Sequence, residues 1–144
     1  GKEGKRNMDG FQALWEHVNQ RPLEFPKPRY NHPVFMDPEN YQWRPVDGAP
    51  GVEEKLLGIF TECRTQAGIL KLDPGAKFQA AGRSIYFVLS GAGNIDGEKY
   101  ARLTTLFVDH DENVTVTADD ATTLYHIGLP DLRSLRATPA IAAE

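Results

Sequence analysis

The feature that most constrains the fold is a change in hydrophobic period near Lys55. From there on, apolar and polar side chains alternate in short runs, which is the period of a half-buried β-strand. Turn sequences rich in Gly, Asp and Pro separate these runs. The predicted strands are residues 55–62, 65–73, 77–80, 84–90, 100–108, 113–117 and 122–128. Many short strands with frequent turns predict an all-β antiparallel sandwich or barrel.

The region before residue 51 has a different composition, because it holds seven of the ten prolines. Proline removes a backbone donor and restricts the residue before it. Residues 21–50 are therefore predicted to form an arm that wraps a surface. Aromatic side chains such as Phe25, Tyr30 and Phe35 punctuate the arm, and they predict packing either on the chain's own barrel or on a neighbouring subunit.

A short amphipathic helix is predicted to precede the arm. Asp9 is the expected N-cap, and Gln12 follows it at the spacing of a capping box. The apolar residues at helical spacing are Phe11, Leu14, Trp15 and Val18. Pro22 ends the pattern. The helix is predicted to pack on the barrel, with a partner-binding helix as the alternative.

Length and composition exclude several classes of protein. A chain of 144 residues is expected to form one domain, and a net charge of −4 argues against non-specific nucleic-acid binding. A single cysteine, Cys63, excludes an internal disulfide framework or a Cys-rich metal site, and it is interpreted as an inert thiol. With neither a membrane-length apolar run nor a signal-like N-terminus, a cytoplasmic location without a membrane partner is expected.

Two stretches resemble the cupin superfamily. Residues 72–76 (LDPGA) and 85–93 (IYFVLSGAG) resemble the first cupin motif, in which a PGA turn leads to a strand ending in VLxGxG. Residues 41–45 (YQWRP) and 50–58 (PGVEEKLLG) resemble cupins of the anti-sigma-factor type. The resemblance implies a cupin double-stranded β-helix, the RmlC-like jelly-roll barrel, with a short N-terminal helix and a proline-rich arm.

The metal ligands that the resemblance implies are missing. Catalytic cupins hold a metal through two His and a Glu of the first motif and a His of the second. In this sequence Ser84 stands at the Glu position, Asn113 stands at the last His position, and no His lies between His32 and His110. No metal site and no cofactor are therefore expected.

The candidate site lies on two strands of the predicted barrel. Alternation places His126 on one face with Leu124, and Tyr86 on the face that would bear the ligand Glu. The predicted ligand-binding cavity comprises Phe78, Ser84, Tyr86, Val88 and His126. Tyr86 and His126 are also candidates for metal-free acid–base catalysis, as in the sugar epimerases of this fold. The alternative is that both side chains fill a packed barrel, and the sequence does not show whether they meet.

Two further patterns have structural interpretations. Asp109, Asp111 and Asn113 follow the spacing of a calcium loop, but Val114 stands where that loop needs glycine, so a polar hairpin turn is predicted. The glycines of residues 91–97 are not followed by a predicted helix, which excludes a dinucleotide-binding turn. Gly91 and Gly93 are instead predicted to form the tight turn that closes a hairpin, and Asp96 and Gly97 to form a second reversal.

The predicted organisation is an N-terminal stretch without regular structure (1–8), the helix and arm (9–50), a barrel with a short C-terminal helix (51–136) and a loose tail (137–144). The expected function is that of a non-catalytic or metal-free cupin domain. Such a domain would bind a small ligand or build a homodimer, and it could be the degenerate half of a two-cupin protein. The alternatives are an acid–base isomerase using Tyr86 and His126, a dioxygenase-like enzyme with unorthodox ligands such as His110 and His126, and a regulatory module.

Overall fold

The structure is a computed structural model that describes residues 8–25, 30–60 and 64–131. The chain divides into two compact units, Gly1–Phe35 and Met36–Glu144. No helix among the described residues has both the length and the apolar character needed to cross a membrane. Cys63 and the predicted C-terminal helix with Leu132 and Leu135 lie outside the described residues.

The first unit contains the predicted helix, α1 (Gly10–Asn19). Asp9 caps it, because its carboxylate oxygen accepts hydrogen bonds from the backbone N–H groups of Phe11 at 2.9 Å and Gln12 at 3.2 Å. The predicted capping box is only half formed, because the Gln12 side chain does not bond back to Asp9. Its amide instead donates a hydrogen bond to the Glu16 carboxylate, one turn along the helix. The helix ends at Gln20 in the left-handed conformation, before Pro22 is reached. Packing of this helix on the barrel stays a prediction.

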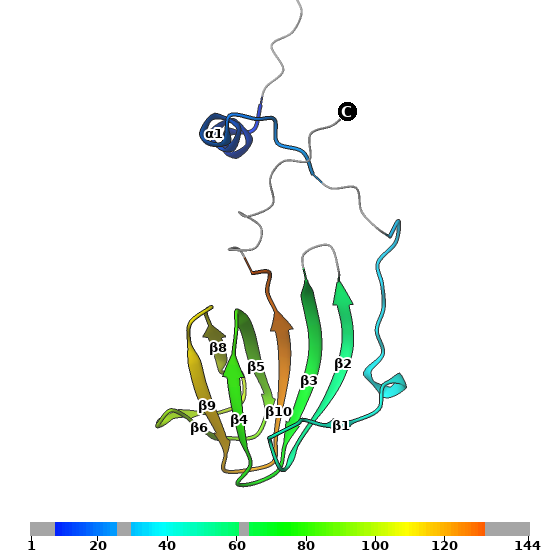
Figure 1. The fold of residues 1–144 in the computed structure, drawn as a ribbon. Helices are drawn as coiled ribbons and strands as arrows, with labels where there is room; N and C mark the ends of the chain where they lie inside the picture. Colours follow the sequence, from blue (N-terminus) through cyan, green and yellow to red (C-terminus); the bar gives the residue numbers. More distant parts are fainter. Residues whose placement is uncertain (1–7, 26–29, 61–63, 132–144) are drawn as a thin grey trace, which may run out of the picture. The chain divides into compact units, whose positions relative to one another are not determined.

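The second unit is all-β, as predicted, and its strands form two antiparallel sheets (Figure 1). A short 3₁₀ helix, η1 (Pro38–Asn40), precedes them. The strands are β1 (Arg44–Pro45), β2 (Val52–Phe60), β3 (Thr65–Leu72), β4 (Lys77–Ala81), β5 (Ser84–Ser90), β6 (Gly93–Ile95), β7 (Glu98–Tyr100), β8 (Thr105–Val108), β9 (Asn113–Ala118) and β10 (Thr122–Gly128).

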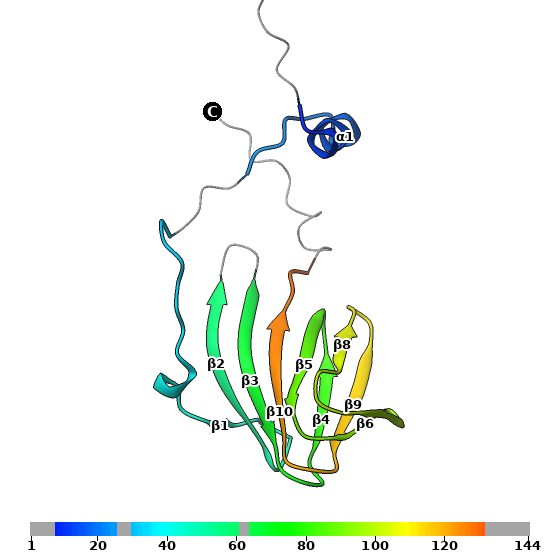
Figure 2. The ribbon, with the colours of Figure 1, turned by 180° about the vertical axis from the view of Figure 1, so that it is seen from behind.

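The strand order shows that the chain crosses repeatedly between the sheets. One sheet has the order β1-β2-β3-β10-β5-β8 and the other has the order β4-β9-β6-β7, and Figures 1 and 2 show the two layers from opposite sides. Alternate residues of the strands point between the layers and form the core. The larger apolar side chains buried most deeply in it are Val52, Leu72, Val88, Val108, Val116 and Leu124.

Two expectations about the strands need correction. The single strand predicted over residues 100–108 is two strands, β7 and β8, because a turn at residues 101–104 carries the chain from one sheet to the other. Strand β6 begins at Gly93, which the sequence suggested was part of a turn. Strand β1 lies at a sheet edge and includes Pro45, where the missing N–H is tolerated.

The glycines around residue 92 also act differently from the prediction. Strands β5 and β6 belong to different sheets, so Gly91 and Gly93 do not close a hairpin between them. Gly91 has a positive φ of 94° and lies directly against the backbone of Ala121 and Thr122. Position 93 needs glycine because the backbone of Thr117 lies so close that a Cβ would overlap its carbonyl oxygen. The reversal at Gly97 does join a hairpin, β6–β7, as predicted.

Candidate functional site

Tyr86 and His126 stand side by side on neighbouring strands of the larger sheet. Strand β10 pairs with β5, and the register sets His126 directly opposite Tyr86. Their ring centroids are 4.6 Å apart and the ring planes differ by 8°, so the two rings stack. The structure therefore brings together the two candidate acid–base residues.

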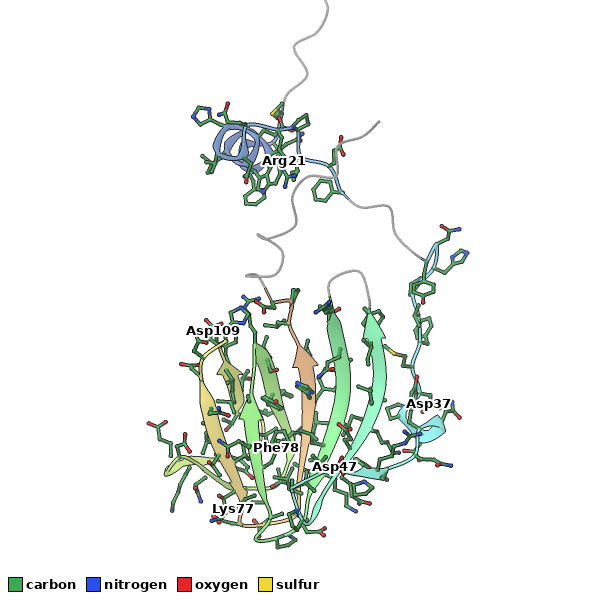
Figure 3. The ribbon with its side chains drawn as sticks, in the orientation of Figure 1. Arg21, Asp37, Asp47, Lys77, Phe78 and Asp109 are labelled. Carbon is green, nitrogen blue, oxygen red and sulfur yellow. The ribbon has the colours of Figure 1, made fainter. Side chains whose placement is uncertain are left out.

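Phe78 reaches this pair from the opposite sheet. It lies on β4, and Figure 3 labels it there. Its ring meets Tyr86 edge-on, with centroids 5.8 Å apart and an interplanar angle of 66°. Phe78, Tyr86 and His126, called the aromatic cluster below, thus fill space between the two sheets. This is the geometry that aromatic side chains favour inside protein cores.

Ser84 completes the inward-facing group on β5. Its hydroxyl oxygen lies 3.3 Å from Nε2 of His126, and Ser84 is 5% exposed. Tyr86 is 3% exposed and shares this inward face. The hydrogen bond gives the partly buried imidazole a polar partner, which lowers the cost of its desolvation.

Burial shifts both titratable groups of the cluster toward their neutral forms. It raises the pKa of the Tyr86 phenol above its ordinary value, with the Ser84 hydroxyl acting in the opposite direction. Burial lowers the pKa of His126 below its ordinary value. Near neutral pH the cluster therefore holds a neutral phenol and a neutral imidazole.

We expect His126 to make the fold less stable in mild acid. Because burial lowers its pKa in the folded protein, the unfolded chain binds this proton more tightly. The imidazole's contribution to the free energy of unfolding should be complete above the ordinary value of 6.5 and should be lost as the pH falls below it. Urea unfolding of the wild type and His126→Gln, followed across this range, measures the difference. Identical pH slopes for the two proteins would contradict the prediction.

Val88 lies farther along β5, where the barrel interior is almost completely packed. Together with Tyr86 and Leu124 it borders a cavity of about 10 Å³. A space of that size holds about one water molecule. The remaining walls of the cavity are Ile95, Tyr100, Leu106 and Val116. At this level the barrel therefore offers no room for an organic ligand.

Solved structures share this arrangement of strands. An acetylacetone dioxygenase from Acinetobacter johnsonii matches with a TM-score of 0.60 and 18% identity, over 74% of this chain and 79% of that one. An RmlC-like cupin from Shewanella frigidimarina matches with a TM-score of 0.57 and 19% identity, over 72% of this chain and 96% of that one. The chain has the cupin fold.

An anti-sigma complex also shares the fold. A chain in the structure of Rhodobacter sphaeroides SigE with the anti-sigma ChrR matches with a TM-score of 0.53 and 20% identity, over 85% of this chain and 68% of that one. No protein-family model matches this sequence, and no curated protein matches it. At these identities the comparisons establish the fold and leave the function open.

The inward-facing donors of this cupin barrel do not fit the metal centre of catalytic cupins. In the candidate cavity they are the Ser84 hydroxyl and the His126 imidazole, which bond to each other, and the phenol of Tyr86. Iron, manganese and zinc are held by several imidazole, thiolate or carboxylate ligands. Across residues 8–25, 30–60 and 64–131, no three His, Cys, Asp or Glu side chains gather in a way that could hold a metal ion.

The acidic segment that follows β8 is a turn. The Glu112 carboxylate accepts a hydrogen bond from the backbone N–H of Asp109 at 2.8 Å, and the Glu112 N–H donates to the Asp109 carbonyl. The turn joins strands of different sheets, so the predicted hairpin is wrong although the predicted turn is present. His110 Nε2 lies 3.5 Å from a carboxylate oxygen of Asp131. These contacts explain the acidic residues of the segment by the turn that they form.

A second group of polar residues could not be predicted from the sequence. Asn40, Gln42, Arg44 and Glu54 line an open groove beside β1 and β2. No motif marks these positions, since they meet only when the arm pairs with the edge of the sheet. The strand predicted from the sequence begins at Lys55 and so leaves out Glu54, which the structure includes in β2.

Proposed function

We propose that this chain is a non-catalytic cupin domain that does not use a metal and that works by binding. The observation that carries the proposal is the aromatic cluster, which fills the space between the sheets beside Ser84, the position that corresponds to the ligand Glu of catalytic cupins. The cavity of about 10 Å³ beside it supports the same conclusion. A barrel filled in this way serves as a rigid core, and binding then falls to the surfaces around it.

Metal content tests this proposal directly. Protein purified without an immobilised-metal column should carry less than about a tenth of an equivalent of iron, zinc or manganese, because structural or catalytic metal sites bind near stoichiometry. His126→Ala serves as the matched variant, and His32→Ala controls for binding at an exposed histidine. Near-stoichiometric metal that is lost in His126→Ala and retained in His32→Ala would overturn the proposal.

Metal-free acid–base catalysis is the second candidate. The observation in its favour is the direct contact of Tyr86 with His126, in which a neutral acid meets a neutral base. Against it, Tyr86 is 3% exposed and is covered by Phe78, so a substrate could reach the phenol only if the cluster opened. Turnover of an aldose or ketose substrate that disappears in Tyr86→Phe, with the fold intact, would favour this candidate.

The expected homodimer and the origin in a two-cupin protein stay proposals. The fold has free sheet edges at β1 and β8, and paired edges are a common way for β-proteins to associate. Light scattering on the purified chain would give its molar mass in solution. A mass of one chain across the accessible concentrations would rule out a stable homodimer.

A further inference from the structure

An open groove of about 420 Å³ lies beside the edge of the larger sheet, within the second unit. Its volume falls in the range of small-molecule sites in proteins. The groove is lined by Asn40, Tyr41, Gln42, Arg44, Glu54 and Leu56. It is distinct from the aromatic cluster, with which it shares no lining residue.

The strand register determines which face of the sheet the groove occupies. Arg44 is paired with Glu54 across β1 and β2, and Glu54 is paired with Leu70 on β3. Directly opposed residues of antiparallel strands point to the same face. Since Leu70 belongs to the core, Arg44 and Glu54 both lie on the core-facing side of the sheet, near its β1 edge.

The opposite face of the same segment is anchored to the sheet. The Lys55 ammonium lies 4.9 Å from the centroid of the Trp43 ring and donates a hydrogen bond to the Pro38 carbonyl at 2.9 Å. Lys55 is 8% exposed, and the ammonium of Lys71 lies 5.9 Å from the same ring. These contacts hold η1 and Trp43 against β2, so the wall of the groove is preorganised.

The polar side chains of the groove have no polar partner among the described residues. Within the described part of the chain, the side chains of Asn40, Tyr41, Gln42, Arg44 and Glu54 make no hydrogen bond or ion pair. This holds even for Arg44 and Glu54, although opposite charges facing each other across strands usually pair. The groove therefore presents a guanidinium, a carboxylate, two amides and a phenol to solvent.

We infer that this groove binds a free α-amino acid with an apolar side chain. The Arg44 guanidinium can take the ligand carboxylate in a two-point contact, and the Glu54 carboxylate can accept from the ammonium. The two charged residues are directly opposed on adjacent strands, whose backbones lie about 4.8 Å apart, and this suits a ligand that carries both charges on one carbon. Leu56 is 42% exposed and offers an apolar contact for the ligand side chain.

This inference rests on the proposed binding role and names a ligand class for it. Titration of ¹⁵N-labelled protein with L-leucine tests it, and saturable shifts are expected in residues 40–56 with a Kd of roughly 0.1–10 mM for an open site. N-acetyl-L-leucine lacks the ammonium and 3-methylbutylamine lacks the carboxylate. Each analogue should bind at least about tenfold more weakly than L-leucine if the groove contacts both charges of the ligand.

Matched variants show whether the binding belongs to the groove. Arg44→Gln and Glu54→Gln should each weaken L-leucine binding about tenfold or more. Arg102→Gln and Glu98→Gln, exposed charges elsewhere on the second unit, should leave it unchanged. Absence of saturable shifts, binding of either analogue as tight as that of L-leucine, or shifts confined to the aromatic cluster would each overturn the inference. Metal analysis tests the proposed function separately, so either idea can fail without the other.

Discussion

Replacing Tyr86 by alanine is expected to lower the free energy of unfolding by about 3–5 kcal/mol, the usual cost of removing a large buried aromatic side chain. The ring is 3% exposed and contacts both Phe78 and His126, so its removal leaves a cavity between the sheets. The existing cavity of about 10 Å³ would be enlarged by the volume of the ring. Urea unfolding followed by circular dichroism measures the loss.

Tyr86→Phe is the control for this prediction. It keeps the ring, the stack on His126 and the edge contact with Phe78, and it removes only the hydroxyl. We expect it to change the free energy of unfolding by no more than about 1.5 kcal/mol, the net value of one hydrogen bond. A loss below about 1 kcal/mol in Tyr86→Ala would show that the cluster is not part of the core and is free to open for a ligand.

Gly91→Ala is expected to destabilise the protein by about 2–5 kcal/mol, the sum of a left-handed backbone penalty and of overpacking. Gly91 has a φ of 94°, and a Cβ added there would lie 2.6 Å from the Ala121 carbonyl oxygen and from Cα of Thr122. Both neighbours are backbone atoms, so relief of the overlap must move the start of β10. Thermal unfolding and urea unfolding both report this loss.

Gly75→Ala separates the two causes. Gly75 also has a positive φ, 82°, but no atom lies within 4 Å of an added Cβ. Its cost should therefore be the backbone penalty alone, about 1–2 kcal/mol. Equal losses at the two glycines would show that the close approach of Gly91 to β10 contributes nothing.

Most strands could be predicted because their signals are local. The alternation over residues 84–90 and 122–128 matches β5 and β10 to the residue, and Asp96 and Gly97 mark the hairpin between β6 and β7. The failures fall where the chain changes sheet. The turn at residues 101–104 interrupts a run that reads as one strand, and its left-handed residue is Leu103, which has no turn preference.

The candidate site was predictable one strand at a time. Alternation sets Ser84 and Tyr86 on one face of β5, and it sets His126 on one face of β10 with Leu124. It does not determine that these strands are neighbours or that the register aligns Tyr86 with His126. Those facts depend on contacts between residues about 40 apart, which no local pattern encodes.

The groove at Arg44 could not be predicted from the sequence either, because it also depends on which segments pair. The arm has the proline content of a surface segment, and its pairing with β2 involves two residues. The residue pattern was enough to predict an all-β fold and to show which side chains of a strand share one face. Only the tertiary structure decided which inward faces meet, because strand neighbours are chosen by burial of the whole core and not by the periodicity of one segment.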